Sequence, residues 1–205
     1  MRMIFIRCLI LLPMERTDQL MAFMREAAKH HLVLRQIWCP DQQRQESDSE
    51  HAWHVALFIM LLGKDYPQLN MEKMLKMALI HDLAEVYAGD FYVLDKKGRE
   101  GKKEREQKAW ETLCAQLPQD LGIEFQQLIT EYEAKQSPEA KLVNACDKLQ
   151  PTLMNLCSEG KSWKKHHATQ VDISSVKLPA LQHDPKLLEM YETVMQEARK
   201  RALLS

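Results

Sequence analysis

Residues that end helices are scarce in this chain. Its 205 residues include six glycines and eight prolines, which together make up about 7% of the chain. In average proteins these two residue types make up about 12%. Rossmann-type folds and β-sandwiches need glycine for phosphate loops and turns, so the scarcity disfavours both. Apolar residues instead recur at three- and four-residue steps, as between Leu20 and Ala27, which indicates amphipathic helices. The sequence therefore predicts one all-α domain with a sizeable core.

Capping residues mark the starts of three central helices. Ser47 and Glu50 form a capping box at the start of the second helix. Asn70 is a suitable cap for a helix that we expect to run unbroken over residues 70–89, with a glycine at its end. Ser137 followed by Pro138 predicts a further long helix, because serine favours the cap and proline the first turn.

Several segments interrupt the helical pattern. Residues 33–50 lose the periodicity and are rich in polar groups, so we expect a long ordered loop. Residues 95–108 are dense in charge and contain two glycines, which indicates a surface segment or a lid over a substrate. Residues 158–185 lack a clear period, and a last helix is expected at 185–203. Pro151 is expected to kink or end the regular bonding of its helix.

Charge and cysteine usage exclude several classes of partner. The 28 basic and 29 acidic residues give a formal net charge of −1, which leaves no bulk attraction for nucleic acid or an anionic membrane. The five cysteines are odd in number and include no C-x-x-C pair, so neither a disulfide framework nor a thiolate zinc site is expected. We therefore predict a cytoplasmic protein that binds no nucleic acid and no membrane.

The first thirteen residues are apolar but do not match a secretion signal. Arg7 interrupts the apolar run, and no small-x-small cleavage site follows it. The run is also shorter than the roughly 20 apolar residues that a membrane-spanning helix needs. We expect residues 1–13 to be an extension outside the fold and residues 14–205 to form the domain.

Two histidines lie in apolar helical surroundings, where an unpaired imidazole is costly to bury. His51 shares an inward stripe with Ile59 on the second helix. On an unbroken third helix His81 and Glu85 share a stripe, and Asp82 lies about 100° round the axis from His81. Adjacent ionisable groups in an apolar helix need a compensating partner, and a divalent metal ion supplies one.

Asp147 adds a carboxylate on the helix that begins at Ser137, where its neighbours also predict an inward direction. The resulting set combines nitrogen and oxygen ligands without sulfur, which fits one manganese, cobalt, iron, nickel or zinc ion per chain better than a structural zinc cage. Four protein ligands leave two positions of an octahedron open for water and substrate. The predicted metal ligands are His51, His81, Asp82 and Asp147.

The order of these four residues resembles the metal-binding signature of the HD-domain phosphohydrolase superfamily. More narrowly, the segments ESDSEHAWHVALF, ALIHDLAEVYAGD and ACDKL are similar to the branch that includes bacterial 5′-deoxynucleotidases and related small HD-domain proteins. The similarity runs from about Thr17 to Leu156. It implies a compact helical HD-domain fold, commonly dimeric, with a metal site between core helices and activity on phosphate esters.

The resemblance also implies roles for individual residues. Glu85 would be the acid–base residue that assists attack of metal-activated water on phosphorus, and Arg35 would contact phosphate through its guanidinium fork. Asp90 would lie near the substrate sugar, although a helix-capping or loop-stabilising role fits it equally well. Trp38 would shape the nucleoside pocket. It stands three positions after Arg35, whereas the similar nucleotidases have tryptophan directly after the arginine, so selectivity for deoxyribose stays open.

The leading hypothesis is a metal-dependent 5′-nucleotidase that releases phosphate from ribo- or deoxyribonucleoside 5′-monophosphates. A second hypothesis is an HD hydrolase of another phosphate compound, such as an alarmone nucleotide. A third is a non-catalytic, metal-stabilised scaffold that binds nucleotide, which Glu85 disfavours because a purely structural site needs no buried acid beside its ligands. We expect a small phosphorylated metabolite as substrate and a homodimer as the assembled state.

Overall fold

Helices make up most of the computed structural model, which describes residues 14–95 and 97–204. The extension predicted at residues 1–13 lies outside the described residues. The elements in chain order are α1 (Arg16–Ala27), η1 (Ala28–Leu32), β1 (Leu34–Trp38), β2 (Gln45–Ser47), α2 (Asp48–Leu62), η2 (Gly63–Asp65), α3 (Met71–Ile80), α4 (Glu85–Ala88), α5 (Lys102–Gln116), α6 (Gln119–Ala134), α7 (Pro138–Cys157), α8 (Lys161–Lys165), α9 (Gln170–Leu181) and α10 (Pro185–Lys200). The predicted all-α fold is confirmed, with one small hairpin added.

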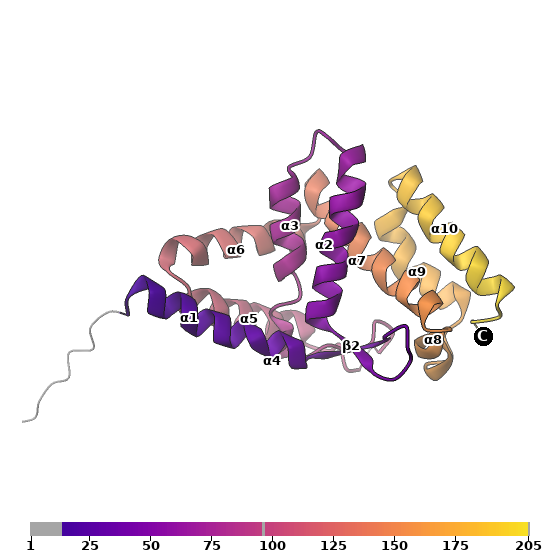
Figure 1. The fold of residues 1–205 in the computed structure, drawn as a ribbon, viewed down its shortest axis with the longest axis horizontal. Helices are drawn as coiled ribbons and strands as arrows, with labels where there is room; N and C mark the ends of the chain where they lie inside the picture. Colours follow the sequence, from indigo (N-terminus) through magenta and orange to yellow (C-terminus); the bar gives the residue numbers. More distant parts are fainter. Residues whose placement is uncertain (1–13, 96, 205) are drawn as a thin grey trace, which may run out of the picture.

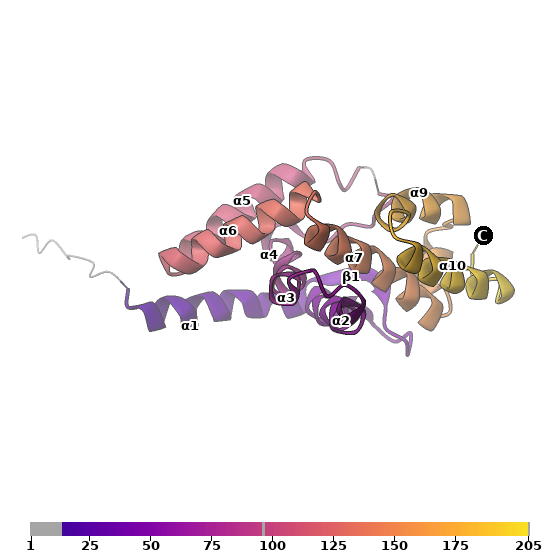
Figure 2. The ribbon, with the colours of Figure 1, turned by 90° about the horizontal axis from the view of Figure 1, so that it is seen from above.

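The core forms where α2, α3 and α7 pack against one another. Fully buried apolar side chains from all three helices meet there, among them Ile59, Met74 and Leu149. In Figures 1 and 2, α1, α5 and α6 extend to one side of this centre, and α8, α9 and α10 lie on the other. The helix α7 spans the middle, so residues at its centre are close to elements from both halves of the chain.

The predicted helix starts are confirmed by their hydrogen bonds. Ser47 Oγ accepts from the backbone nitrogen of Glu50 at 3.3 Å, and Glu50 Oε2 accepts from that of Ser47 at 2.9 Å, which completes the capping box of α2. The side chain of Asn70 caps α3, and that of Ser137 caps α7. Removing such a cap typically costs about 1 kcal/mol.

The prediction of a single unbroken helix over residues 70–89 is wrong, because α3 ends at Ile80 and α4 begins only at Glu85. Between them Leu83 donates to the carbonyl of Ile80 at 2.9 Å, and Glu85 to that of Asp82 at 2.9 Å. These bonds span three residues, as in a 3-10 turn. His81 and Asp82 therefore leave the regular helix, and buried partners on other elements compensate the polar groups of this turn.

The loop expected at residues 33–50 contains an antiparallel hairpin instead. Strands β1 and β2 pair Leu34 with Ser47 and Trp38 with Gln45. The amide of Gln45 also donates to the backbone carbonyl of Arg35 at 2.7 Å. Branched and aromatic residues in β1 favour a strand. The hairpin holds Arg35 in a defined position beside the start of α2.

The region expected to be irregular at 158–185 contains α8 and α9. The buried stripe of α9 consists of Ile173, Lys177 and Leu181, spaced four residues apart. Because a lysine occupies the middle of this stripe, hydrophobic periodicity does not reveal the helix.

Pro151 does not end α7, which continues to Cys157. Proline removes one backbone donor from the helix, and the Thr152 hydroxyl adds a bond to the carbonyl of Lys148 at 3.0 Å.

The predicted surface segment at 95–108 runs into α5 at Lys102, and its role as a lid stays a prediction. Within the part of the chain that the structure describes, no helix is both long and apolar enough to cross a bilayer.

Candidate metal centre and substrate cavity

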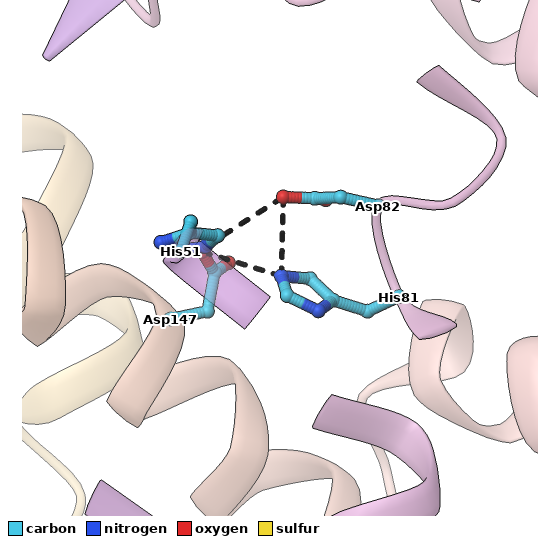
Figure 3. A group of neighbouring side chains, drawn as sticks. All are labelled: His51, His81, Asp82 and Asp147. Carbon is cyan, nitrogen blue, oxygen red and sulfur yellow. Dashed lines mark hydrogen bonds and ion pairs between the residues drawn. The ribbon is translucent and has the colours of Figure 1, made fainter. Parts of the chain in front are cut away.

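The four predicted metal ligands converge on one point at the centre of the fold (Figure 3). His51 comes from the start of α2, His81 and Asp82 from the turn after α3, and Asp147 from the middle of α7. One ligand atom of each lies within 4.8 Å of the others. Asp147 Oδ1 is 3.2 Å from His51 Nε2, and Asp82 Oδ2 is 3.2 Å from His81 Nε2.

Outer hydrogen bonds orient both imidazoles toward this point. His51 Nδ1 donates to Oε1 of Gln150 at 2.8 Å, and His81 Nδ1 donates to the carbonyl of Ala78 at 2.9 Å. Such bonds leave Nε2 of each ring directed at the cluster, as in protein metal sites. Sequence reasoning missed Gln150, although its position almost one turn after Asp147 on the same helix was a usable signal.

The cluster fits a divalent transition metal on its own chemistry. Two imidazole nitrogens and two carboxylate oxygens are a suitable donor set. Among the described residues, His81 Nε2 is buried without an aligned hydrogen-bond partner. Burial lowers the pKa of His81, but the carboxylates of Asp82 and Asp147 outweigh burial and raise it to about 10. The two carboxylates therefore favour a positive charge at this point, which a metal ion supplies.

Metal binding is expected to displace about one proton, because His81 is protonated below its pKa of about 10 when no metal is bound. Burial, reinforced by Arg35, lowers the pKa of His51 to about 4, so His51 has no proton to release at neutral pH. The affinity should rise about tenfold per pH unit between about pH 6.5 and 8.5. Chelator competition over this range measures the slope, and a pH-independent affinity would contradict the protonation of His81.

Glu85 lies beside the cluster at the start of α4 and is 3% exposed. Its Oε1 accepts from Lys102 Nζ at 2.7 Å, whereas its Oε2 has no partner among the described residues. Burial and the neighbouring Asp82 and Asp48 raise the pKa of Glu85 to about 10, against the opposing charge of Lys102. The carboxyl group is therefore placed and tuned to hold a proton near the cluster.

Arg35 reaches the cluster from β1. Its Nη1 donates to Asp82 Oδ2 at 2.9 Å and to Asp48 Oδ1 at 3.1 Å. Sequence reasoning missed Asp48, a fully buried carboxyl group directly after the cap of α2. Burial raises the pKa of Asp48 to about 7, and Arg35 opposes that shift. The two acids fix the guanidinium beside the candidate metal site.

An open cavity of about 100 Å³ gives access to these groups and continues into a wider cleft of about 580 Å³. Arg35, Glu85 and Asp90 line the smaller cavity, and Asp82 and Asp147 line both. A cleft of this size is typical of small-molecule sites, which measure about 300 to 1,000 Å³.

Of the two remaining predicted substrate residues, Asp90 lines the cavity and Trp38 does not. Asp90 lines the cavity, and its Oδ2 accepts from the backbone nitrogen of Gln36 at 3.3 Å. Trp38 is not among the residues that line this cavity, and its indole ring lies under Lys161, whose Nζ is 3.6 Å from the ring centroid. The structure brings Asp90 to the site but not Trp38.

Two further residues that sequence reasoning did not assign contact Asp147. The hydroxyl of Tyr132 donates to Asp147 Oδ2 at 3.1 Å, and Lys148 Nζ donates to the same oxygen at 2.6 Å. Tyr132 belongs to α6, so no pattern local to α7 could reveal it. These contacts fix one carboxylate oxygen and leave Oδ1 directed at the histidines.

The fold and the site together define an all-α protein with a candidate divalent-metal centre between its core helices. The HD domain family matches residues 27–186, which is most of the chain. The chain belongs to the HD domain family.

Several known proteins are similar to this chain. The human 5′-deoxynucleotidase HDDC2 is 35% identical over 135 residues, which cover 65% of each protein. The Xenopus laevis protein of the same name is 29% identical over 87% of each chain. A crystal structure of a predicted metal-dependent phosphohydrolase from Magnetospirillum magnetotacticum superimposes with a TM-score of 0.86 at 35% identity, covering 93% of this chain and 96% of that one.

Proposed function

We propose that this chain is a metal-dependent phosphomonoesterase that releases phosphate from ribo- or deoxyribonucleoside 5′-monophosphates. The observation that carries the proposal is one cavity lined by both aspartates of the two-histidine, two-aspartate cluster, by the buried acid Glu85 and by the fixed arginine Arg35. The relatives named 5′-deoxynucleotidase support the substrate class. The cleft beside the cluster is large enough for a mononucleotide.

The proposed metal ligands are His51, His81, Asp82 and Asp147, which would hold one manganese, cobalt, iron, nickel or zinc ion. A divalent ion bound there polarises a phosphoryl oxygen and lowers the pKa of water toward 7. The donor set alone does not select among these metals, since their supply in the cell also decides which one binds.

Arg35 and Glu85 supply the remaining chemistry. The guanidinium of Arg35 is held by Asp48 and Asp82 and donates to phosphate oxygens, which carry more negative charge as the bond to the leaving oxygen breaks. Glu85 Oε2, the oxygen that Lys102 does not engage, is the atom where a proton is held. In its carboxylate form Glu85 would take a proton from the attacking water, and the acid so formed would return that proton to the departing 5′-oxygen of the nucleoside. The positive charge of a bound metal ion would favour this carboxylate form.

Asp90 is proposed to bind the substrate sugar, since its carboxylate lines the cavity beside Arg35. Trp38 is proposed to shape the nucleoside pocket, and a nucleoside stacked on the ring face that Lys161 occupies would have to displace that lysine. The homodimeric state and the cytoplasmic location stay predictions.

A substrate panel tests the proposal directly. Protein stripped of metal and reloaded with manganese or cobalt is expected to release phosphate fastest from 5′-mononucleotides, and far more slowly from 3′-mononucleotides. Comparing ribo- and deoxyribonucleotides measures the sugar preference. Faster turnover of an alarmone nucleotide would favour the second hypothesis, and release from no phosphate ester would favour a nucleotide-binding scaffold.

A further inference from the structure

The buried stripe of α9 contains an unusual residue. Ile173, Lys177 and Leu181 face the interior, with exposed fractions of 2%, 7% and 0%. Lysine is almost never buried to this extent unless an anion pairs with it. The burial of Ile173 and Leu181 is expected for apolar side chains, whereas the burial of Lys177 has to be explained.

Lys177 lies at the border between an apolar pocket and the substrate cavity. A small pocket of about 20 Å³ places it beside Ile37, Trp163 and Ile173, which can pack against its aliphatic stem. Lys177 also lines the substrate cavity, together with Arg35 and other charged residues. The side chain thus has apolar support along its length and access to the cavity at its charged end.

The described part of the chain offers Lys177 no anionic partner, since no ion pair or hydrogen bond joins its ammonium to a carboxylate there. The nearby acids are engaged elsewhere, Asp147 by Lys148 and Asp82 by Arg35. Burial lowers the pKa of Lys177 to about 7, and the positive charge of Lys148 lowers it further than Asp147 raises it. A buried cation without a counter-charge is unfavourable, so an anion from outside the chain would satisfy it.

We infer that Lys177, together with Arg35, binds the phosphoryl group of the substrate in the cavity that Asp82 and Asp147 also line. This inference rests on the proposed function and adds a second residue that binds the phosphoryl group. A phosphate monoester carries two negative charges at its phosphoryl group, whereas a diester carries one. The unpaired ammonium of Lys177 therefore favours a terminal phosphate monoester over a diester, and α9 contributes directly to the substrate site.

Lys177→Met keeps the length of the aliphatic stem and removes the charge. It is expected to raise the KM for a 5′-mononucleotide and the inhibition constant of inorganic phosphate at least about tenfold, the effect of losing one charged hydrogen bond. Inhibition by the corresponding nucleoside, which lacks the phosphate, should not change. The melting temperature of the free protein should stay the same or rise, because an unpaired buried charge is gone.

Two further variants complete the test. Lys177→Arg restores a cation and is expected to recover part of the phosphate affinity. Lys200→Met removes an exposed lysine at the end of α10 and should leave all these constants unchanged. Unchanged inhibition by phosphate in Lys177→Met would overturn the inference. Equal weakening of nucleoside and phosphate binding, with a lower melting temperature, would also overturn it by showing a purely structural role.

Binding of inorganic phosphate separates this inference from the proposed function, because it requires no turnover. If the wild-type protein hydrolyses no ester, thermal shift with inorganic phosphate still reports on the site. A rise in melting temperature in wild type that Lys177→Met lacks would support the inference. An equal rise in both proteins, or none in wild type, would contradict it.

Discussion

Glu85→Gln protein is expected to keep its metal and to lose turnover by about a hundred- to ten-thousandfold, the usual contribution of a general acid–base group. Glutamine preserves the volume of the side chain and an oxygen that can accept from Lys102, which donates to Glu85 Oε1 at 2.7 Å. It cannot hold a transferable proton at the position of Oε2. Turnover of a 5′-mononucleotide and metal content measured on the same samples separate the two effects.

Glu106→Gln is a suitable control for that variant. Glu106 contacts the same lysine, with Oε1 at 3.1 Å from Lys102 Nζ, but lies on the next turn of α5 and is more exposed than Glu85. It should retain nearly full turnover. Equal turnover of Glu85→Gln and wild type would exclude proton transfer by Glu85, and loss of metal in Glu85→Gln would assign it to the ligand set instead.

Asp147→Asn is expected to reduce metal content from about one ion per chain to nearly none, and to abolish phosphate release with it. The carboxylate is 5% exposed and lies between two imidazoles, His51 and His81, so no water can replace its charge at low cost. A ligand that binds only the folded state stabilises it. Metal should therefore raise the melting temperature of wild type and leave that of Asp147→Asn almost unchanged.

Metal analysis and thermal unfolding, each with and without added metal, test this expectation. Asp82→Asn should behave similarly and also loosen Arg35, which donates to Asp82 at 2.9 Å. Asp120→Asn provides the control, since that carboxylate pairs with Arg16 on the surface and should affect neither metal content nor the thermal response to metal. Full metal content in both Asp147→Asn and Asp82→Asn would refute the proposed ligand set.

Local signals in the sequence were sufficient to predict where the three central helices begin. The caps at Ser47, Asn70 and Ser137 act on backbone groups within three residues, so the starts of α2, α3 and α7 could be read directly. The same signals could not show that α3 stops at Ile80. That break depends on where the polar groups after it find partners, which other elements supply.

Residues far apart in the chain account for what was missed around the site. Gln150 orients His51 across 99 positions, and Tyr132 on α6 holds a carboxylate on α7. Arg35 meets Asp82 only because the hairpin folds back beside the turn after α3. None of these contacts leaves a periodic pattern, since each joins one polar atom to another on a different element.

The sequence alone indicated an all-α fold, because hydrophobic period and capping are properties of short segments. It also indicated the candidate metal ligands, because each inward direction follows from neighbours on one helix and their order along the chain resembles a family signature. The tertiary structure alone decided which polar groups share a buried environment. It placed Glu85 beyond a break in the helix, covered Trp38 with Lys161 and brought Lys177 of α9 to the cavity. Burying a charged group is costly unless another group compensates it, and that balance depends on every element packed around the site.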